Sequence, residues 1–156
     1  MSIFRRSRHD SDDRFVVAGL GNPGERYANT RHNAGALVIE ELLKRTNAKL
    51  KSHKSGTLIA EVVLEQHKVT LARPTSYMNE SGRPLGQLMR FYKVDPSRLI
   101  VVHDEIDIPF DEVRIKVGGG TAGHNGLKSI VNHLGTQDFI RVRLGMGRPR
   151  GSKDAK

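Results

Sequence analysis

Five polar side chains lie in predicted loops at the ends of strands, and their types are suited to hydrolysis. They are one histidine, one aspartate and three asparagines: His32, Asp104, Asn22, Asn79 and Asn125. A neutral imidazole can take a proton from water, and a carboxylate stabilises the imidazolium that forms. Asparagine amides both donate and accept hydrogen bonds, so they can hold an ester carbonyl, a peptide amide or a ribose hydroxyl. These residue types indicate hydrolysis without a metal or a covalent nucleophile, but they leave the substrate open.

The elements that must position these residues are read from apolar periodicity. The pattern predicts strands at 15–20, 57–65, 67–72, 99–105, 113–117 and 139–147, and helices at 33–46, 79–94 and 127–134. Two of the strands, 57–65 and 67–72, read as an antiparallel hairpin, whereas the others alternate with helices. We therefore expect an α/β fold, a single domain with a mixed twisted sheet flanked by helices. Sites in such sheets form where loops gather at the carboxyl ends of strands.

The first glycine-rich stretch has the spacing of a dinucleotide-binding loop. Gly19, Gly21 and Gly24 follow a strand with the pattern G-x-G-x-x-G. The third glycine does not open a helix, however, and no acidic residue closes a second strand about twenty residues later. The spacing therefore does not support a dinucleotide cofactor.

The second glycine-rich stretch, 118–126, is not a phosphate-binding P-loop, because no Gly-Lys-Ser/Thr follows at the required spacing. Its glycines would let the backbone approach a bulky ligand while His124 and Asn125 project at a helix start. The alternative is that Asn125 only caps the helix at 127–134.

Other catalytic chemistries find little support. The triplet His103–Asp104–Glu105 ends a strand, but alternation places Asp104 on the face opposite His103, and no metal-ligand spacing is present. There is no G-x-S-x-G elbow for a serine nucleophile. The chain contains no cysteine, which excludes a cysteine nucleophile, thiolate metal sites and disulfides. We therefore expect neither a metal nor a cofactor.

Charge suggests the kind of partner. The formal net charge is +9, of which +1 lies in residues 1–14 and +3 in residues 148–156, so the body carries +5. A basic body of this kind suits a polyanion, because each neutralised phosphate releases condensed counterions. The alternative is that the charge serves solubility alone.

The 156 residues are enough for one domain with a hydrophobic core. We expect a flexible N-terminal tail at 1–14, the domain at 15–149 and a short C-terminal end at 150–156. No apolar run approaches the length of a membrane span, and no signal peptide opens the chain. We therefore expect a cytoplasmic protein that does not bind membranes. We also expect a monomer.

Four motifs together resemble the bacterial peptidyl-tRNA hydrolase family. In chain order they are GLGNPGERYANTRHNAG, RPTSYMNESG, VVHDEIDIP and GGGTAGHNGLKSI. The resemblance covers about 15–149. It implies an α/β domain with a mixed sheet and a cofactor-free esterase. That esterase cleaves peptidyl-tRNA between the peptide carboxyl and the 3′ ribose and so recycles tRNA from aborted translation.

The resemblance also implies roles for individual residues. His32 matches the catalytic base, Asp104 the carboxylate that keeps it basic, and Asn22 the residue that senses a blocked amino group. Four further residues match positions that contact the tRNA end or the peptide: Tyr27, Tyr77, Asn79 and Asn125. Position 77 is often phenylalanine in the family, but tyrosine offers the same stacking face.

The chain departs from the family at its C-terminal end. Family members usually continue for some tens of residues with a helix that packs on the sheet, and we expect that helix to be absent from 150–156.

Two rival functions are the alternatives to hydrolysis. One is an RNA-binding protein that has lost catalysis, which the presence of His32 and Asp104 disfavours. The other is a nucleotide-dependent oxidoreductase, which the first glycine loop does not support.

Overall fold

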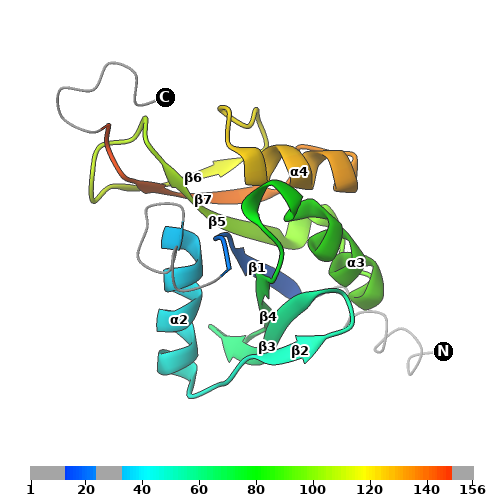
Figure 1. The fold of residues 1–156 in the computed structure, drawn as a ribbon. Coiled ribbons are helices and arrows are strands. Elements are labelled where there is room, and N and C mark those ends of the chain that lie inside the picture. The colour runs from blue at the N-terminus through cyan, green and yellow to red at the C-terminus, as the bar shows by residue number, and fades with distance from the viewer. Residues whose placement is uncertain (1–12, 24–32, 149–156) are drawn as a thin grey trace.

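Seven strands form one mixed sheet in the computed structural model, which describes residues 13–23 and 33–148 (Figure 1). The strands are β1 (Phe15–Gly19), β2 (Lys51–His53), β3 (Thr57–Leu64), β4 (His67–Pro74), β5 (Leu99–Glu105), β6 (Val113–Val117) and β7 (Ile140–Gly145). Their order across the sheet is β2-β3-β4-β1-β5-β7-β6. The central strands β4, β1, β5 and β7 run parallel, whereas β2, β3 and β6 pair antiparallel with their neighbours.

Three α-helices, counted over residues 13–23 and 33–148, cover the two faces of the sheet (Figure 1). The helical elements of the described residues are α2 (Ala34–Thr46), α3 (Gly82–Tyr92) and α4 (Asn125–Leu134), with the short 3-10 turns η3 (Met78–Glu80) and η4 (Pro96–Arg98). Helix α2 packs on one face, and α3 and α4 pack side by side on the other. The sheet is therefore the middle layer of three.

The period-two alternation of the strands divides the core between these faces. In β1, Val16 and Ala18 pack with the residues of α3 and α4, whereas Val17 packs with Ile39 and Leu43 of α2. Strand β5 alternates in the same way. Because the central strands are buried on both faces, they appear in the sequence as nearly continuous apolar runs.

Helix α2 lies unusually close to the sheet because two glycines face each other at its start. A Cβ atom on Gly19 would lie 2.3 Å from the carbonyl oxygen of Gly35, and one on Gly35 would lie 2.2 Å from the carbonyl oxygen of Val102. The amide of Ala36 donates to the carbonyl of Leu20 at 3.1 Å. The first glycine-rich stretch therefore serves close helix–sheet packing directly after β1, where the chain leaves the sheet.

The structure confirms the predicted fold class and corrects several element bounds. Strand β2 was not predicted, and the segment 79–94 is divided into η3 and α3. Helix α4 begins at residue 125 rather than 127. The expectations for the N-terminal tail, for the end at 150–156 and for Tyr27 and His32 fall wholly or almost wholly outside the described residues.

Candidate active site

The described candidate residues gather where β1, β4 and β5 end and α4 begins. Asn22 follows β1, and both Tyr77 and Asn79 follow β4. Asp104 is the penultimate residue of β5, and Asn125 is the first residue of α4. These parallel strands have their carboxyl ends at the same edge of the sheet, which is the edge where α/β proteins form their sites. The elements η3 and α4 are in contact with each other.

Asn22 is held at both its backbone and its side chain. Its amide donates to Oδ1 of Asn33 at 2.7 Å, and Nδ2 of Asn33 donates back to its carbonyl at 3.1 Å. The Oδ1 atom of Asn22 accepts from the amide of Met78 at 2.6 Å. Because a backbone N–H can only donate, this contact fixes the amide orientation of the side chain. Asn22 therefore presents its Nδ2 group as a hydrogen-bond donor.

Asp104 is buried and pairs with a histidine that the sequence analysis did not assign to it. Its Oδ1 atom lies 3.0 Å from Nε2 of His124, and the two side chains are 7% and 6% exposed. His124 is the N-cap of α4, where its Nδ1 atom accepts from the amides of Gly126 and Leu127. The alternative that Asn125 caps this helix is therefore wrong.

His103, the neighbour of Asp104, is buried in a neutral form. Its Nδ1 atom donates to the carbonyl of Asp104 at 2.8 Å, and its ring lies edge-on to that of His124 with 4.9 Å between centroids. Burial, and then the neighbouring His124, lower the pKa of His103 to about 4. Because Nδ1 carries the proton, the buried Nε2 atom is left as an acceptor, and it has no partner among the described residues.

Three of the predicted contact residues are exposed at the starts of η3 and α4. Tyr77 is 55% exposed, and Asn79 and Asn125 are exposed as well. Close packing fixes their elements, since a Cβ atom on Gly126 would meet Sδ of Met78 at 2.7 Å. An exposed tyrosine and two exposed asparagines thus lie on two elements that pack together, and one of these elements, α4, is joined to the buried Asp104 through His124.

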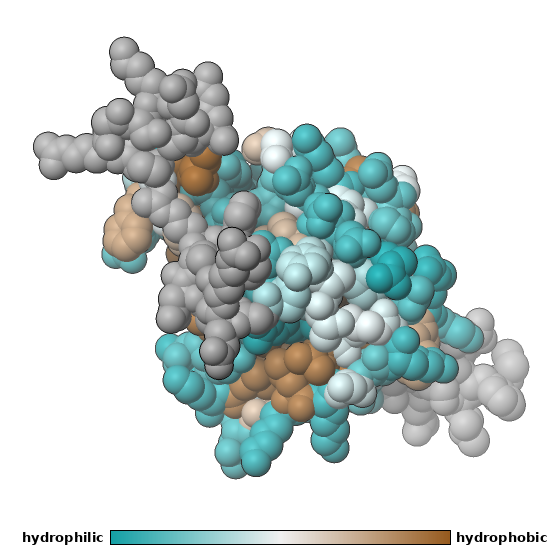
Figure 2. All heavy atoms as spheres, viewed as in Figure 1, coloured by the Kyte–Doolittle hydropathy of each residue, from teal (hydrophilic) through white to brown (hydrophobic). Residues whose placement is uncertain are grey.

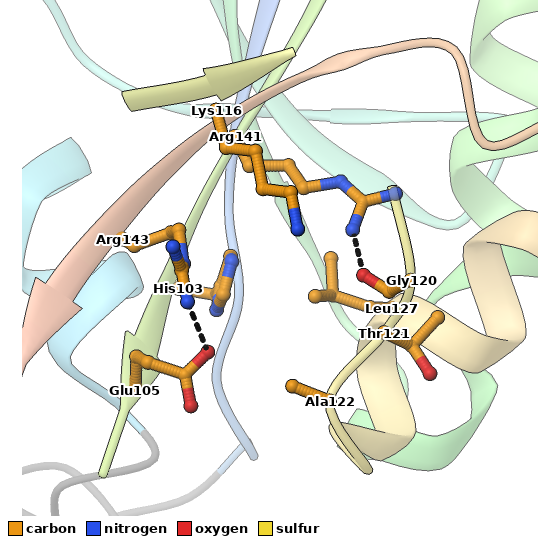
Figure 3. A pocket seen from close by; sticks show the side chains of 9 residues that line it. All are labelled: His103, Glu105, Lys116, Gly120, Thr121, Ala122, Leu127, Arg141 and Arg143. Atoms are coloured by element: carbon orange, nitrogen blue, oxygen red, sulfur yellow. Dashed lines mark hydrogen bonds and ion pairs between the residues drawn. The ribbon is translucent and has the colours of Figure 1, made fainter. Parts of the chain in front are cut away.

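A small basic pocket lies beside the site, between the sheet and the start of α4 (Figure 3). Lys116 of β6 and the pair Arg141 and Arg143 of β7 line it, together with His103 and Glu105 of β5. Nη2 of Arg143 lies 3.4 Å from Oε1 of Glu105. Three cationic side chains therefore line the pocket together with one carboxylate, which leaves a surplus of positive charge there.

Arg141 is the buried member of this group, and it holds the glycine-rich loop. Its guanidinium donates to the carbonyls of Gly120, Gly119 and Gln137, the last two at 2.7 and 3.2 Å. Desolvation, followed by the nearby Arg143, lowers its pKa from the usual arginine value. These contacts fix the loop that leads from β6 to His124.

The surface is mainly hydrophilic on the face seen in Figure 2, with hydrophobic side chains in small separate patches. Among the described residues, no helix is long and apolar enough to cross a membrane. Within the same ranges, no group of three or more histidine or acidic side chains could hold a metal ion.

Comparison with known proteins gives one consistent family. The family model described as peptidyl-tRNA hydrolase matches residues 16–156. A peptidyl-tRNA hydrolase of Frankia alni is 55% identical over 143 residues, which are 92% of this chain and 73% of the relative. The Mycobacterium marinum protein of that name is 55% identical over 140 residues, or 89% and 73% of the two chains. A crystal structure of the Acinetobacter baumannii peptidyl-tRNA hydrolase superposes with a TM-score of 0.85 at 40% identity, covering 92% and 72%.

Proposed function

The chain belongs to the peptidyl-tRNA hydrolase family, and from this premise we propose that it hydrolyses the ester bond of peptidyl-tRNA to release the peptide and free tRNA. The resemblance recognised in the four sequence motifs is thereby confirmed. The observation that carries the proposal in this chain is the buried Asp104 carboxylate at the sheet edge, with the donor group of Asn22 on the neighbouring strand end.

The proposed mechanism is general-base hydrolysis. His32, which lies outside the described residues, takes a proton from a water molecule that attacks the ester carbonyl. Asp104 stabilises the imidazolium that forms. The bond between the carbonyl carbon and the 3′ oxygen of the ribose then breaks. The leaving oxygen takes the proton from His32, so that water and ester become a carboxylic acid and an alcohol. Asn79, Asn125, Tyr77 and Tyr27 are proposed to hold the tRNA end and the peptide.

Asn22 is proposed to distinguish peptidyl-tRNA from aminoacyl-tRNA. A blocked amino group brings an acyl carbonyl, and this carbonyl can accept from Nδ2 of Asn22. A free amino group is an ammonium, which only donates, so it would face another donor. The discrimination follows from the contact with Met78, because that contact directs the side-chain oxygen away and leaves the donor end for substrate.

The test compares the wild type with Asn22→Asp on N-acetyl-aminoacyl-tRNA and on the unblocked aminoacyl-tRNA. The wild type is expected to cleave the blocked substrate, with little action on the unblocked one, equally in the presence of EDTA. Asn22→Asp keeps an oxygen for the amide of Met78 but loses the donor. Its preference for the blocked substrate should fall by about 1–3 kcal/mol, or roughly 5- to 150-fold. Release of ester-linked amino acid measures both rates.

Two outcomes would count against these assignments. Binding of tRNA without cleavage by the wild type would favour the RNA-binding alternative over hydrolysis. An unchanged preference in Asn22→Asp would remove Asn22 from substrate discrimination while leaving the hydrolase function intact.

Lys116 and Arg143 are proposed to contact tRNA phosphates. Arg143 lies on β7, next to β5, which carries Asp104, and Lys116 lies on β6, one strand further toward the edge of the sheet. Phosphates near the scissile ester are therefore proposed to come within their reach. Each lost phosphate contact should reduce the slope of log affinity against log salt by about one. We expect this reduction in Lys116→Ala and not in Lys44→Ala. Lys44 lies in the last turn of α2, whereas the first turn of that helix follows Asn33, which bonds to Asn22. Fluorescence anisotropy with tRNA over a salt series measures the slopes, and equal slopes for the two variants would refute the contact.

A further inference from the structure

We infer that His124 is a positioning residue. The N-terminus of α4 keeps the single ring proton of His124 on Nε2, and this N–H group donates a hydrogen bond to Asp104. The functional part of this inference rests on the proposed role of Asp104 in hydrolysis. The proton position rests on the hydrogen bonds alone.

The two ring nitrogens of His124 have different partners. Nδ1 lies 3.1 Å from the amide of Gly126 and 3.3 Å from that of Leu127. Backbone amides only donate, so Nδ1 must offer a lone pair. The proton of the neutral ring therefore lies on Nε2, which is 3.0 Å from Oδ1 of Asp104. This carboxylate oxygen accepts it.

The surroundings of the ring hold it in this orientation. The N-terminus of α4 carries amides that have no acceptor within the helix, and it also carries a partial positive charge. Both favour a lone pair over a proton at Nδ1. Packing leaves the ring little room, because a Cβ atom on Gly126 would lie 3.0 Å from Cε1 of His124. The ring of His103 closes another side, with 4.9 Å between centroids.

This arrangement separates His124 from a general base. A base that is oriented by a carboxylate donates to it from one nitrogen and keeps a lone pair on the other for the proton of water. In His124 the lone pair of that other nitrogen, Nδ1, is already used by two helix amides. His124 therefore acts through Asp104. It fixes the direction of the carboxylate and links it to the positive end of α4.

Two substitutions separate the two contacts of the ring. Asparagine places an oxygen near the position of Nδ1 and is a favoured N-cap residue, but it is too short to reach Asp104. Glutamine places an NH₂ group near the position of Nε2, but it is a poor N-cap. His124→Asn should therefore preserve helix stability and lose the donor, whereas His124→Gln should do the reverse.

The expected result is a crossed pattern of stability and turnover. His124→Asn should melt close to the wild type but show a kcat lowered by about tenfold or more, since a hydrogen bond to a charged group is lost. Its KM for N-acetyl-aminoacyl-tRNA should be unchanged. His124→Gln should melt at a lower temperature and yet retain a higher kcat than His124→Asn. If turnover instead follows melting temperature across the two variants, His124 is only a cap and the inference is overturned.

A second measurement uses the wild type and needs no substrate. The ¹⁵N shifts of the His124 ring distinguish the two neutral tautomers from imidazolium. We expect the Nε2–H tautomer at neutral pH, and an Nδ1–H tautomer or a doubly protonated ring would overturn the inference. Failure of the wild type to cleave peptidyl-tRNA would refute the proposed function and leave the tautomer result standing, so the two failures are distinguishable.

Discussion

His32→Ala is expected to remove most of the turnover of N-acetyl-aminoacyl-tRNA while leaving tRNA binding nearly intact. General-base catalysis contributes about 10²–10⁴-fold to the rate, so the loss of kcat should be of that order. Two histidines of the described residues, His103 and His124, contact Asp104, and neither is expected to replace the base. Nδ1 of His124 accepts from α4 amides, and His103 is almost fully buried.

The matched control for this variant is His67→Ala. His67 is exposed at the start of β4, at the other end of the strand from the candidate site, so its loss should leave kcat near the wild-type value. Melting curves are needed for His32→Ala, because the next residue, Asn33, is buried and bonds to Asn22. A fully folded His32→Ala variant with kcat within a few-fold of the wild type would refute the assignment of the base.

The strands of the sheet could be predicted where a local pattern determines them. The segment 99–105 was predicted with the bounds of β5, because a strand buried on both faces gives an apolar run, here 99–102, and no glycine or proline interrupts the chain before residue 105. The hairpin of β3 and β4 was also predicted. Its turn residues Glu65 and Gln66 both have positive φ, as a two-residue turn of type I′ requires. Strand β2 was missed because its three residues, Lys51–His53, are polar and gain their order only by pairing with β3.

The candidate site was predictable in its location and less so in its contacts. Asn22 and Asp104 could be placed at one edge because parallel strands end together. The partnership of Asp104 with His124 could not, since the two residues are twenty positions apart and meet only when α4 packs on the sheet. A local signal was available nonetheless. A polar residue directly before Asn125–Gly126 is a candidate N-cap, and a histidine can fill that position through Nδ1.

One glycine near the site was interpreted for the wrong partner. The glycines of 118–126 were expected to let the backbone approach a ligand, yet Gly126 packs against Met78 and leaves no space for a Cβ atom, whereas nothing lies within 4 Å of a Cβ atom placed on Gly120 or Gly123. Gly119 and Gly120 offer their carbonyls to the buried Arg141. Composition indicates that backbone approaches something closely at such positions. It does not tell whether that neighbour is a ligand or another part of the chain.

Asp104→Asn is expected to lower kcat by less than His32→Ala does and to shift the acid limb of the pH–rate profile to lower pH. The asparagine keeps an oxygen that can accept from Nε2 of His124, so the buried pair should keep its shape. The negative charge is removed, and the second carboxylate oxygen becomes an NH₂ group. A nearby carboxylate raises the pKa of a histidine, so its loss lowers that pKa. The base then stays unprotonated, and therefore active, to lower pH, although its imidazolium is less stabilised and the plateau rate falls.

The matched control is Asp107→Asn, which removes a half-exposed carboxylate three residues further along that contacts Arg148. It tests whether charge in this region shifts the limb without direct contact, and a surface charge is expected to have little effect because solvent screens it. Profiles of kcat/KM against pH for the wild type and both variants give the comparison. If the limb of Asp104→Asn coincides with the wild type, Asp104 is not coupled to the titrating base. Its buried hydrogen bond to His124 would then serve only to join the end of β5 to the start of α4.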